Sequence, residues 1–237
     1  MRWSYTRHSQ YEKCKSNANY WVESRPTEDN LILNRITAVG VLVHRTLESL
    51  LTDHIGETVS QAYRSIRPRD MLNCLKVHYK RVEFVGVDEI PLPKITVMKS
   101  MVQNGLRHIM AKWPNATIHA VEWELEVEDI VGIVDLALIQ NHREVIELIL
   151  VDWKTRNARP IATNNLQLAV YENISKHHVD SDKMNSYLAL IHPRQNTMLM
   201  VTNSEEFRKH ARNLIQSELE EWSDLIIGSV FCSCGQC

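Results

Sequence analysis

The chain has 237 residues, of which 44% are hydrophobic and 24% are charged, and its formal net charge is −2. This is the composition of a globular protein that forms one large domain or two small ones, and we expect one. The balanced charge excludes a basic coat that holds nucleic acid by charge alone, although a local basic groove remains compatible with it. With no apolar signal peptide and no membrane-spanning run, we expect an intracellular protein, cytoplasmic or nucleoid-associated, without a membrane partner.

The first half of the chain is predicted to be mainly helical. Thr6 is a suitable N-cap for a first helix that would carry Cys14, and a second helix is predicted from Ile36 to His54. The stretch from Glu57 to Trp113 is mostly helical in pattern and is broken at its prolines. It has no chemical motif, so we interpret it as a helical insertion ahead of the core.

From Thr117 the hydrophobic period becomes that of strands. Apolar residues from Val121 to Val127 alternate with three glutamates, which predicts a half-buried strand. Two runs rich in Val, Ile and Leu follow, Gly132 to Ile139 and Val145 to Lys154, and the polar residues 140–143 between them predict a hairpin.

The remainder alternates again between helix and strand. Helical spacing from Asn164 to His178 is followed by two strand-like runs, Ser186 to Ile191 and Thr197 to Thr202, and by a final amphipathic helix from Ser204 to Ile227. We therefore expect one α/β domain over residues 1–237, made of an N-terminal segment (1–35), a helical part (36–116), a core (117–203), and a C-terminal helix with a cysteine tail (204–237).

Two aspartates stand within these apolar strands, where burial of a charge is costly without a partner or a cation. They are Asp135 in the first strand of the hairpin and Asp152 in the second. Because residues two apart on a strand share a face, Asp152 and Lys154 should project together while Trp153 points into the core. A turn centred near residues 142 and 143 would pair Asp135 with Leu150 and make Asp152 its diagonal neighbour, about 7–8 Å away.

Two neighbouring carboxylates suit Mg²⁺ or Mn²⁺, which prefer oxygen ligands. Such a cation would polarise a scissile phosphate and activate a water for attack, and Lys154 would offset the developing charge. The same residues fit an ordinary Asp–Lys pair at a strand end equally well, because Asp-x-Lys is a common pattern.

Read with their flanks, these residues resemble the RecB-like branch of the PD-(D/E)xK nucleases, specifically its iron–sulfur members. The family's motifs stand here in order as Gly40-x-x-x-His44, Asp135, Asp152-Trp153-Lys154, and Gln167 with Tyr171. Glu122 lies about where the family often places a further acidic residue, with Glu124 and Glu126 as alternatives. The resemblance spans nearly the whole chain and is weakest from 57 to 113. Its layout is similar to that of the CRISPR-associated RecB-type nucleases, the AddB nuclease domain and exonuclease V.

This resemblance implies a restriction-endonuclease-like fold, in which a mixed central sheet is flanked by helices, and Mg²⁺- or Mn²⁺-dependent hydrolysis of DNA. The activity would be that of an exonuclease, an endonuclease or both, on single strands or duplex ends. By resemblance the metal ligands are His44, Asp135, Asp152 and the backbone carbonyl of Trp153, and Lys154 is the catalytic lysine. Gln167 and Tyr171, four residues apart on a helix, would orient Lys154 or touch DNA. A non-catalytic or weakly catalytic DNA-binding subunit of a repair or CRISPR-adaptation complex remains an alternative.

Four of the five cysteines stand near the two ends of the chain: Cys14, Cys232, Cys234 and Cys237. Because a reducing compartment disfavours disulfides, the close spacing of the last three indicates a metal site for which Cys14 would supply the fourth ligand. In the family such cysteines hold a [4Fe–4S] cluster that joins the N- and C-terminal segments. The spacing here is tighter than the family's, four thiolates suit Zn²⁺ equally well, and unligated thiols are a third possibility.

Overall fold

The computed structural model of the chain describes residues 4, 5, 8, 9, 31–34, 38–85, 94–142, 144–155, 165–179 and 184–227. Its elements in chain order are β1 (Leu31–Asn34), α3 (Ala38–Thr52), α4 (Val59–Ser65), α5 (Pro68–Lys80), β2 (Val82–Val85), α6 (Ile95–Lys112), β3 (Thr117–Val127), β4 (Ile130–His142), β5 (Val145–Trp153), α7 (Leu166–Ser175), β6 (Met184–His192), β7 (Thr197–Val201) and α8 (Glu205–Ile227). Among these described helices, none is long and apolar enough to cross a bilayer.

The main sheet has five strands in the order β3-β4-β5-β6-β7. Neighbouring strands are antiparallel except β5 and β6, which are parallel, so the sheet is mixed as expected. A parallel pair needs a crossover connection, and α7 lies within that connection. The strands and helices predicted from residue 117 onward are thus confirmed as elements.

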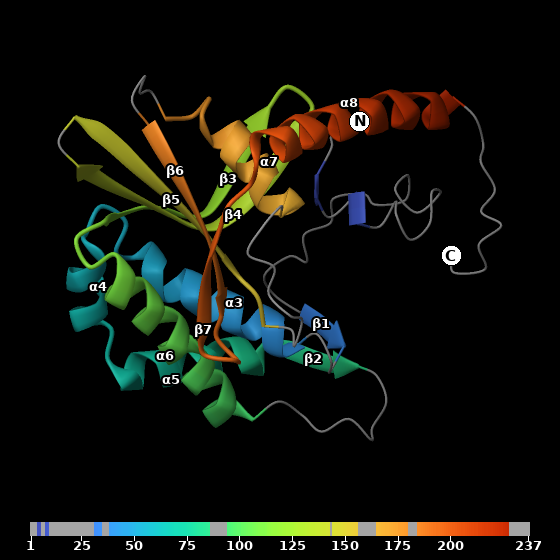
Figure 1. Ribbon diagram of the computed structural model, residues 1–237. Helices are drawn as coiled ribbons and strands as arrows, with labels where there is room; N and C mark the ends of the chain where they lie inside the picture. The colour runs from blue at the N-terminus through green and yellow to red at the C-terminus, as the bar shows by residue number, and fades with distance from the viewer. Residues whose placement is uncertain are drawn as a thin grey trace.

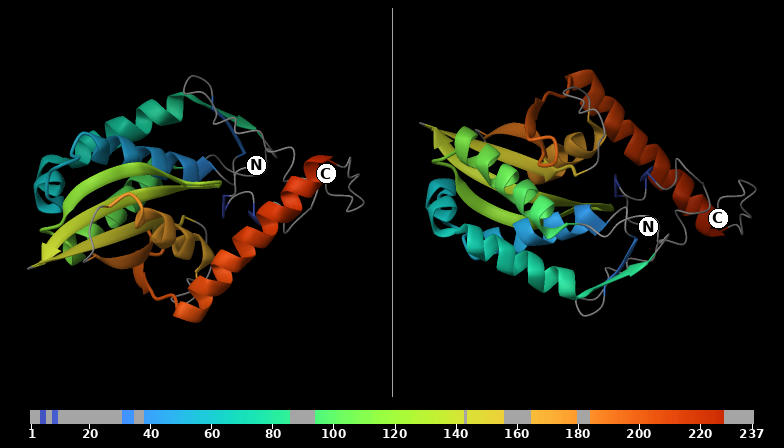
Figure 2. Two further views of the ribbon diagram at one scale, coloured as in Figure 1. Left: turned by 90° about the horizontal axis from the view of Figure 1, so that it is seen from above. Right: turned by 90° about the horizontal axis from the view of Figure 1, so that it is seen from below.

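Helices cover both faces of this sheet (Figure 1). Along β5, Ile149, Val151 and Trp153 join a core formed with α3 to α6, whereas Leu148 and Leu150 join a second core formed with α7 and α8. We call these the α3–α6 face and the α7–α8 face. The two views in Figure 2 show α8 as a long helix that runs obliquely past the strands.

Local signals explain where several helices begin. Thr58 and Gln61 form a capping box at the start of α4, since each side chain bonds to the other residue's backbone. Pro68 begins α5, where its missing N–H costs nothing, so the predicted break at this proline is a boundary between helices. Asn165 caps α7 through Leu168 N.

Three predictions about the fold were wrong in detail. The helical part contains strand β2, which pairs in parallel with β1, and neither strand was predicted. Residues 140–142 belong to β4, because Gln140, Asn141 and His142 pair with β5. The turn therefore lies one residue later than predicted on each strand, and Ala137, not Asp135, pairs with Leu150.

Candidate active site

Three acidic side chains lie on one line across β3, β4 and β5. The pairs Val121–Leu136 and Trp123–Val134 place Glu122 opposite Asp135. The pairing of β4 with β5 ends at Leu136 and Val151, and one further step in that register reaches Asp135 and Asp152. The two-residue correction of the register therefore makes these aspartates direct neighbours on adjacent strands, closer than the predicted diagonal arrangement.

The strands β4 and β5 part at Asp135. Its Oδ2 accepts a hydrogen bond from the backbone N–H of Trp153 at 2.6 Å, in place of a ladder bond. Val134 packs in the α7–α8 core and Leu136 in the α3–α6 core, although residues two apart normally share a face. The backbone thus turns over at Asp135, which directs this carboxylate toward the boundary between the two cores.

Glu122 marks a similar irregularity in β3. Its φ is +47°, the left-handed region that non-glycine residues rarely adopt, and Val121 and Trp123 on either side pack in different cores. Such conformations concentrate at functional sites, where surrounding contacts maintain them. The sequence left three glutamates as equivalent candidates, and the structure brings Glu122 to Asp135.

His44 reaches this line of acids from α3. Its Nδ1 lies 3.6 Å from Asp135 Oδ2, and ligand atoms of His44, Glu122 and Asp135 all lie within 4.8 Å of one another. Gly40, one turn earlier, allows the close approach: a Cβ there would lie 2.7 Å from the hydroxyl oxygen of Thr155. The spacing Gly40-x-x-x-His44 therefore sets α3 against the end of β5 and points the imidazole at the carboxylates.

Lys154 lies next to the third acid and is held by α7. Its Nζ is 2.6 Å from Asp152 Oδ2 and donates to Gln167 Oε1 at 2.7 Å. Gln167 Nε2 in turn donates to the hydroxyl of Tyr171 at 2.8 Å. The Tyr171 ring packs over Gly132, where a Cβ would lie 2.9 Å from a ring carbon. Four side chains from β5 and α7 thus form one connected polar network.

Charge and burial shift the pKa values in this cluster. Burial, opposed by Lys154 and reinforced by Asp135, raises the pKa of Asp152 to about 6. Burial alone would lower the pKa of His44, but the charges of Asp135, Asp152 and Glu122 outweigh it and raise that pKa. Burial and the charge of Asp152 raise the pKa of Tyr171 far above its usual range, so its phenol stays protonated.

The donor set fits a divalent cation. Carboxylate oxygens and an imidazole nitrogen converge within coordination reach at His44, Glu122 and Asp135. Asp152 Oδ2 is buried. It forms an ion pair with Lys154 Nζ at 2.6 Å, but this contact lacks the alignment of a hydrogen bond. Three clustered carboxylates against one lysine and one imidazole leave an excess of negative charge, which a cation of two charges would offset.

The other predicted ligands lie outside the described residues. They are the four cysteines at positions 14, 232, 234 and 237. Trp153 is described, and its side chain packs on the α3–α6 face, opposite Asp152, as predicted.

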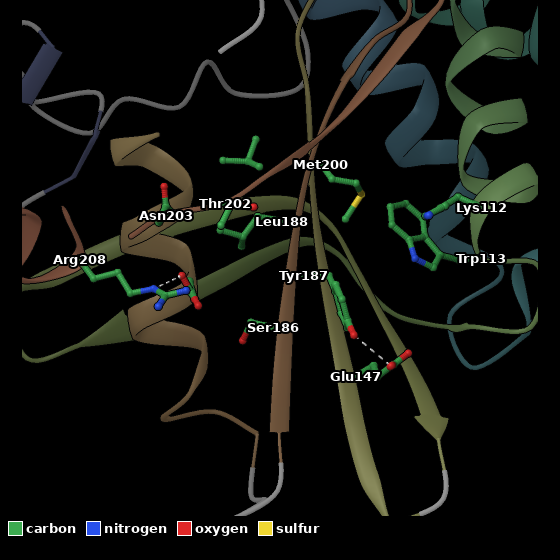
Figure 3. A pocket seen from close by; sticks show the side chains of 12 residues that line it. Lys112, Trp113, Glu147, Ser186, Tyr187, Leu188, Met200, Thr202, Asn203 and Arg208 are labelled. Carbon is green, nitrogen blue, oxygen red and sulfur yellow. Dashed lines mark hydrogen bonds and ion pairs between the residues drawn. The ribbon is translucent and has the colours of Figure 1, made fainter. Parts of the chain in front are cut away.

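A cavity of about 550 Å³ lies elsewhere, beside β6 and β7 (Figure 3). Arg208 on one wall is ion-paired with Glu172 at 3.0 Å, and on the other wall the hydroxyl of Tyr187 donates to Glu147 at 3.2 Å. None of the residues in the line of acids borders this cavity. Its charges are mostly satisfied by one another, so the acidic line remains the better candidate for chemistry.

A mixed sheet that aligns acids with a lysine on an Asp-x-Lys strand end, beside a helical histidine, is chemically suited to metal-dependent hydrolysis of a phosphodiester. The family model of the PD-(D/E)XK nuclease superfamily matches residues 2–237, so the chain belongs to this superfamily. Its members are nucleases that use divalent metal ions and act on DNA, and the mixed five-stranded sheet is consistent with their restriction-endonuclease-like fold. No curated protein matched the chain.

Proposed function

We propose that the protein is an Mg²⁺- or Mn²⁺-dependent deoxyribonuclease of the RecB-like iron–sulfur branch, acting on single-stranded DNA or duplex ends as an exonuclease, an endonuclease or both. The observation that supports this most is the line of Glu122, Asp135 and Asp152 across three strands, with His44 and Lys154 beside it. An ordinary surface Asp–Lys pair would not bring two further acids and an imidazole to the same place.

His44, Glu122, Asp135 and Asp152 would hold the cation, together with the backbone carbonyl of Trp153. The bond from Trp153 N–H to Asp135 fixes that carboxylate and leaves its other oxygen for a ligand. When bound, the cation supplies Lewis-acid polarisation of the scissile phosphate.

Lys154 would orient the attacking water and stabilise charge that develops on the phosphoryl oxygens. The Lys154 side chain is about one-third exposed, so it can meet a substrate while Asp152 and Gln167 fix its position. Gln167 and Tyr171 act as positioning residues, because their hydrogen bonds end on Lys154. This connected arrangement supports a catalytic role for the lysine over a purely structural one.

The decisive experiment replaces Lys154 and Asp152 separately by alanine and follows cleavage of labelled single-stranded and duplex DNA with Mg²⁺ or Mn²⁺. Loss of a preorganised charge-stabilising group costs about 10²–10³-fold, so we expect each variant to lose at least about 10²-fold in rate. Lys112→Ala, an exposed lysine on α6, is the matched control and should cut like the wild type. Wild-type rates in both site variants would exclude the assignment. A wild-type protein that binds DNA but never cuts it would favour the non-catalytic subunit.

The cysteine site is a separate part of the proposal and rests on the sequence alone. Cys14, Cys232, Cys234 and Cys237 would hold a structural [4Fe–4S] cluster, or Zn²⁺ as the alternative. Because the site would close a loop of more than two hundred residues, its metal should stabilise the fold. Anaerobically purified protein should be brown and contain iron; colourless protein with one zinc per chain would select the alternative, and neither metal would exclude both.

A further inference from the structure

The outer surface of α5 has a charge unlike that of the rest of the chain. Residues 64–81 contain six Lys and Arg side chains and one acidic side chain, in a chain whose net charge is −2. All six are exposed: Arg64, Arg67, Arg69, Lys76, Lys80 and Arg81. The acidic one, Asp70, is engaged by Arg67 at 3.1 Å.

Three of the basic residues form a row along α5. Arg69, Lys76 and Lys80 are exposed, as are Asn73 and Val77 between them, and this spacing of three, four and seven residues follows one side of a helix. We call Arg69, Lys76 and Lys80 the basic stripe. The opposite side of α5 buries Met71 and Leu75 against α3 and α6. Among the described residues, no carboxylate lies within ion-pair distance of the stripe, and the nearby Asp70 is paired with Arg67 but also interacts electrostatically with Arg69.

The C-terminal end of the stripe lies near α3, the helix that carries His44. The last turn of α5 is joined to α3, because His78 Nε2 lies 3.0 Å from the hydroxyl of Ser49. Burial, together with the charges of Arg45 and Arg81, lowers the pKa of His78, so both guanidinium groups lie near this junction. Arg45 directly follows His44 on α3. Ser49 is five residues after His44 on the same helix, a rise of about 7–8 Å along the helix axis.

We propose, on the basis of the proposed nuclease function, that the basic stripe of α5 binds the sugar–phosphate backbone of the DNA strand that enters the active site. Arg69 and Lys80 are eleven residues apart, about 16 Å at 1.5 Å per residue. One strand of B-form DNA has a phosphate for each 3.4 Å of axis, so this length corresponds to about four or five phosphates. Lys and Arg contacts to phosphates carry no sequence information, so we expect this contact to be independent of the DNA sequence.

The test measures how DNA binding depends on salt. The triple variant Arg69→Gln/Lys76→Gln/Lys80→Gln is compared with Arg107→Gln/Lys112→Gln/Lys209→Gln, which also removes one arginine and two lysines from exposed helical positions. Both are made in the full chain with Lys154→Ala to prevent cleavage. Fluorescence anisotropy of a labelled single-stranded oligonucleotide of mixed sequence is recorded between 50 and 200 mM salt.

Loss of three phosphate contacts should reduce the slope of log K against log salt by about 2, because each contact to a single strand contributes about 0.7. The affinity lost over this salt range should then be about 15–20-fold smaller than for the parent protein. The control triple should keep the parent slope. Lys76→Gln alone should lower the slope by about 0.7, which keeps the test valid if the triple variant melts early.

The outcomes separate the two proposals. If the parent binds DNA and the wild type cuts it, but both triple variants keep the parent slope, the stripe has no DNA-binding role. If the wild type neither binds nor cuts DNA, the nuclease proposal itself is wrong, whatever the stripe does.

Discussion

The two faces of the sheet differ in the kinds of side chain that are buried against them. On α3 to α6, the only polar side chain among the described fully buried residues is Thr46, whose hydroxyl donates to its own helix at Leu42 O. On the α7–α8 face, three acids are buried: Asp152, Glu172 and Glu218. Each has a cationic or imidazole partner: Lys154, Arg208 and His8, respectively. Apolar packing and buried charge are therefore divided between the faces, and the line of acids lies where strands β3 and β4 pass from one face to the other.

The largest expected effect tests the apolar face. Trp153 is buried there among α3 and α6 residues, so Trp153→Ala should lower the free energy of unfolding by about 3–5 kcal/mol. Chemical denaturation measures the free energy of unfolding. Trp123 lies on edge strand β3 and is only partly buried, so Trp123→Ala should lower that free energy much less. Equal losses in the two variants would show that the apolar face is not the more stabilising one.

The next effect has the opposite sign and tests the polar face. The pKa of Asp152 is about 6 in the fold, against 3.8 as its ordinary value. Because the folded protein holds this proton more tightly, its contribution to stability is present at low pH and is lost as pH rises from about 4 to 6. Asp152→Asn should therefore stabilise the metal-free protein at pH 7, by up to about 3 kcal/mol, while removing activity.

Asp70→Asn is the control for that measurement. Bonds from the backbone and side chain of Arg67 lower the pKa of this exposed carboxyl, so its loss should slightly destabilise the protein at pH 7. Thermal melts of both variants between pH 4 and 7 decide the matter. If Asp152→Asn is instead less stable than the wild type at pH 7, the raised pKa of Asp152 in the folded protein is wrong.

The smallest effect concerns the contact that joins α3 to β5. Gly40→Ala places a Cβ 2.7 Å from Thr155 Oγ1, so either the Thr155 side chain or α3 must move, and a shift of α3 displaces His44. We expect cleavage to fall about tenfold, since small displacements of positioned groups reduce rates strongly, with little change in melting temperature. Adding Thr155→Ala removes that oxygen and leaves the nearest atom 3.9 Å away, so the double variant should recover activity. Failure to recover would mean that Gly40 acts through something other than this contact.

The residue pattern predicted the strands of the core well. Apolar and polar residues alternate along β3, and β4 and β5 contain nearly continuous apolar runs, as half-buried and fully buried strands do. It did not predict the register of the hairpin. Gln140 and Asn141 are polar and looked like a turn, yet they extend β4 at its exposed end and shift the pairing by two residues. Strands β1 and β2 were missed because each has four residues and pairs only with the other, far away in the chain.

For the site, Asp135, Asp152 and Lys154 were predicted from charges within apolar strands, and motif order added His44. The sequence pattern could not predict which of the three glutamates lies beside these residues. Regular alternation would have put Glu122, Glu124 and Glu126 on one face, and only the left-handed backbone at Glu122 distinguishes it. The bond from Trp153 N–H to Asp135 likewise depends on where two strands diverge, which residue types do not encode.

The left-handed backbone at Glu122 brings the stability of the chain into conflict with the presence of a carboxylate at this position. A left-handed conformation costs a non-glycine residue about 1–2 kcal/mol, and a glycine would adopt it without this cost. Engineering or drift toward greater stability would therefore favour glycine at position 122 and would delete a carboxylate from the line of acids. Glutamate at position 122 therefore lowers stability, and under the proposed function it supplies a carboxylate that glycine could not.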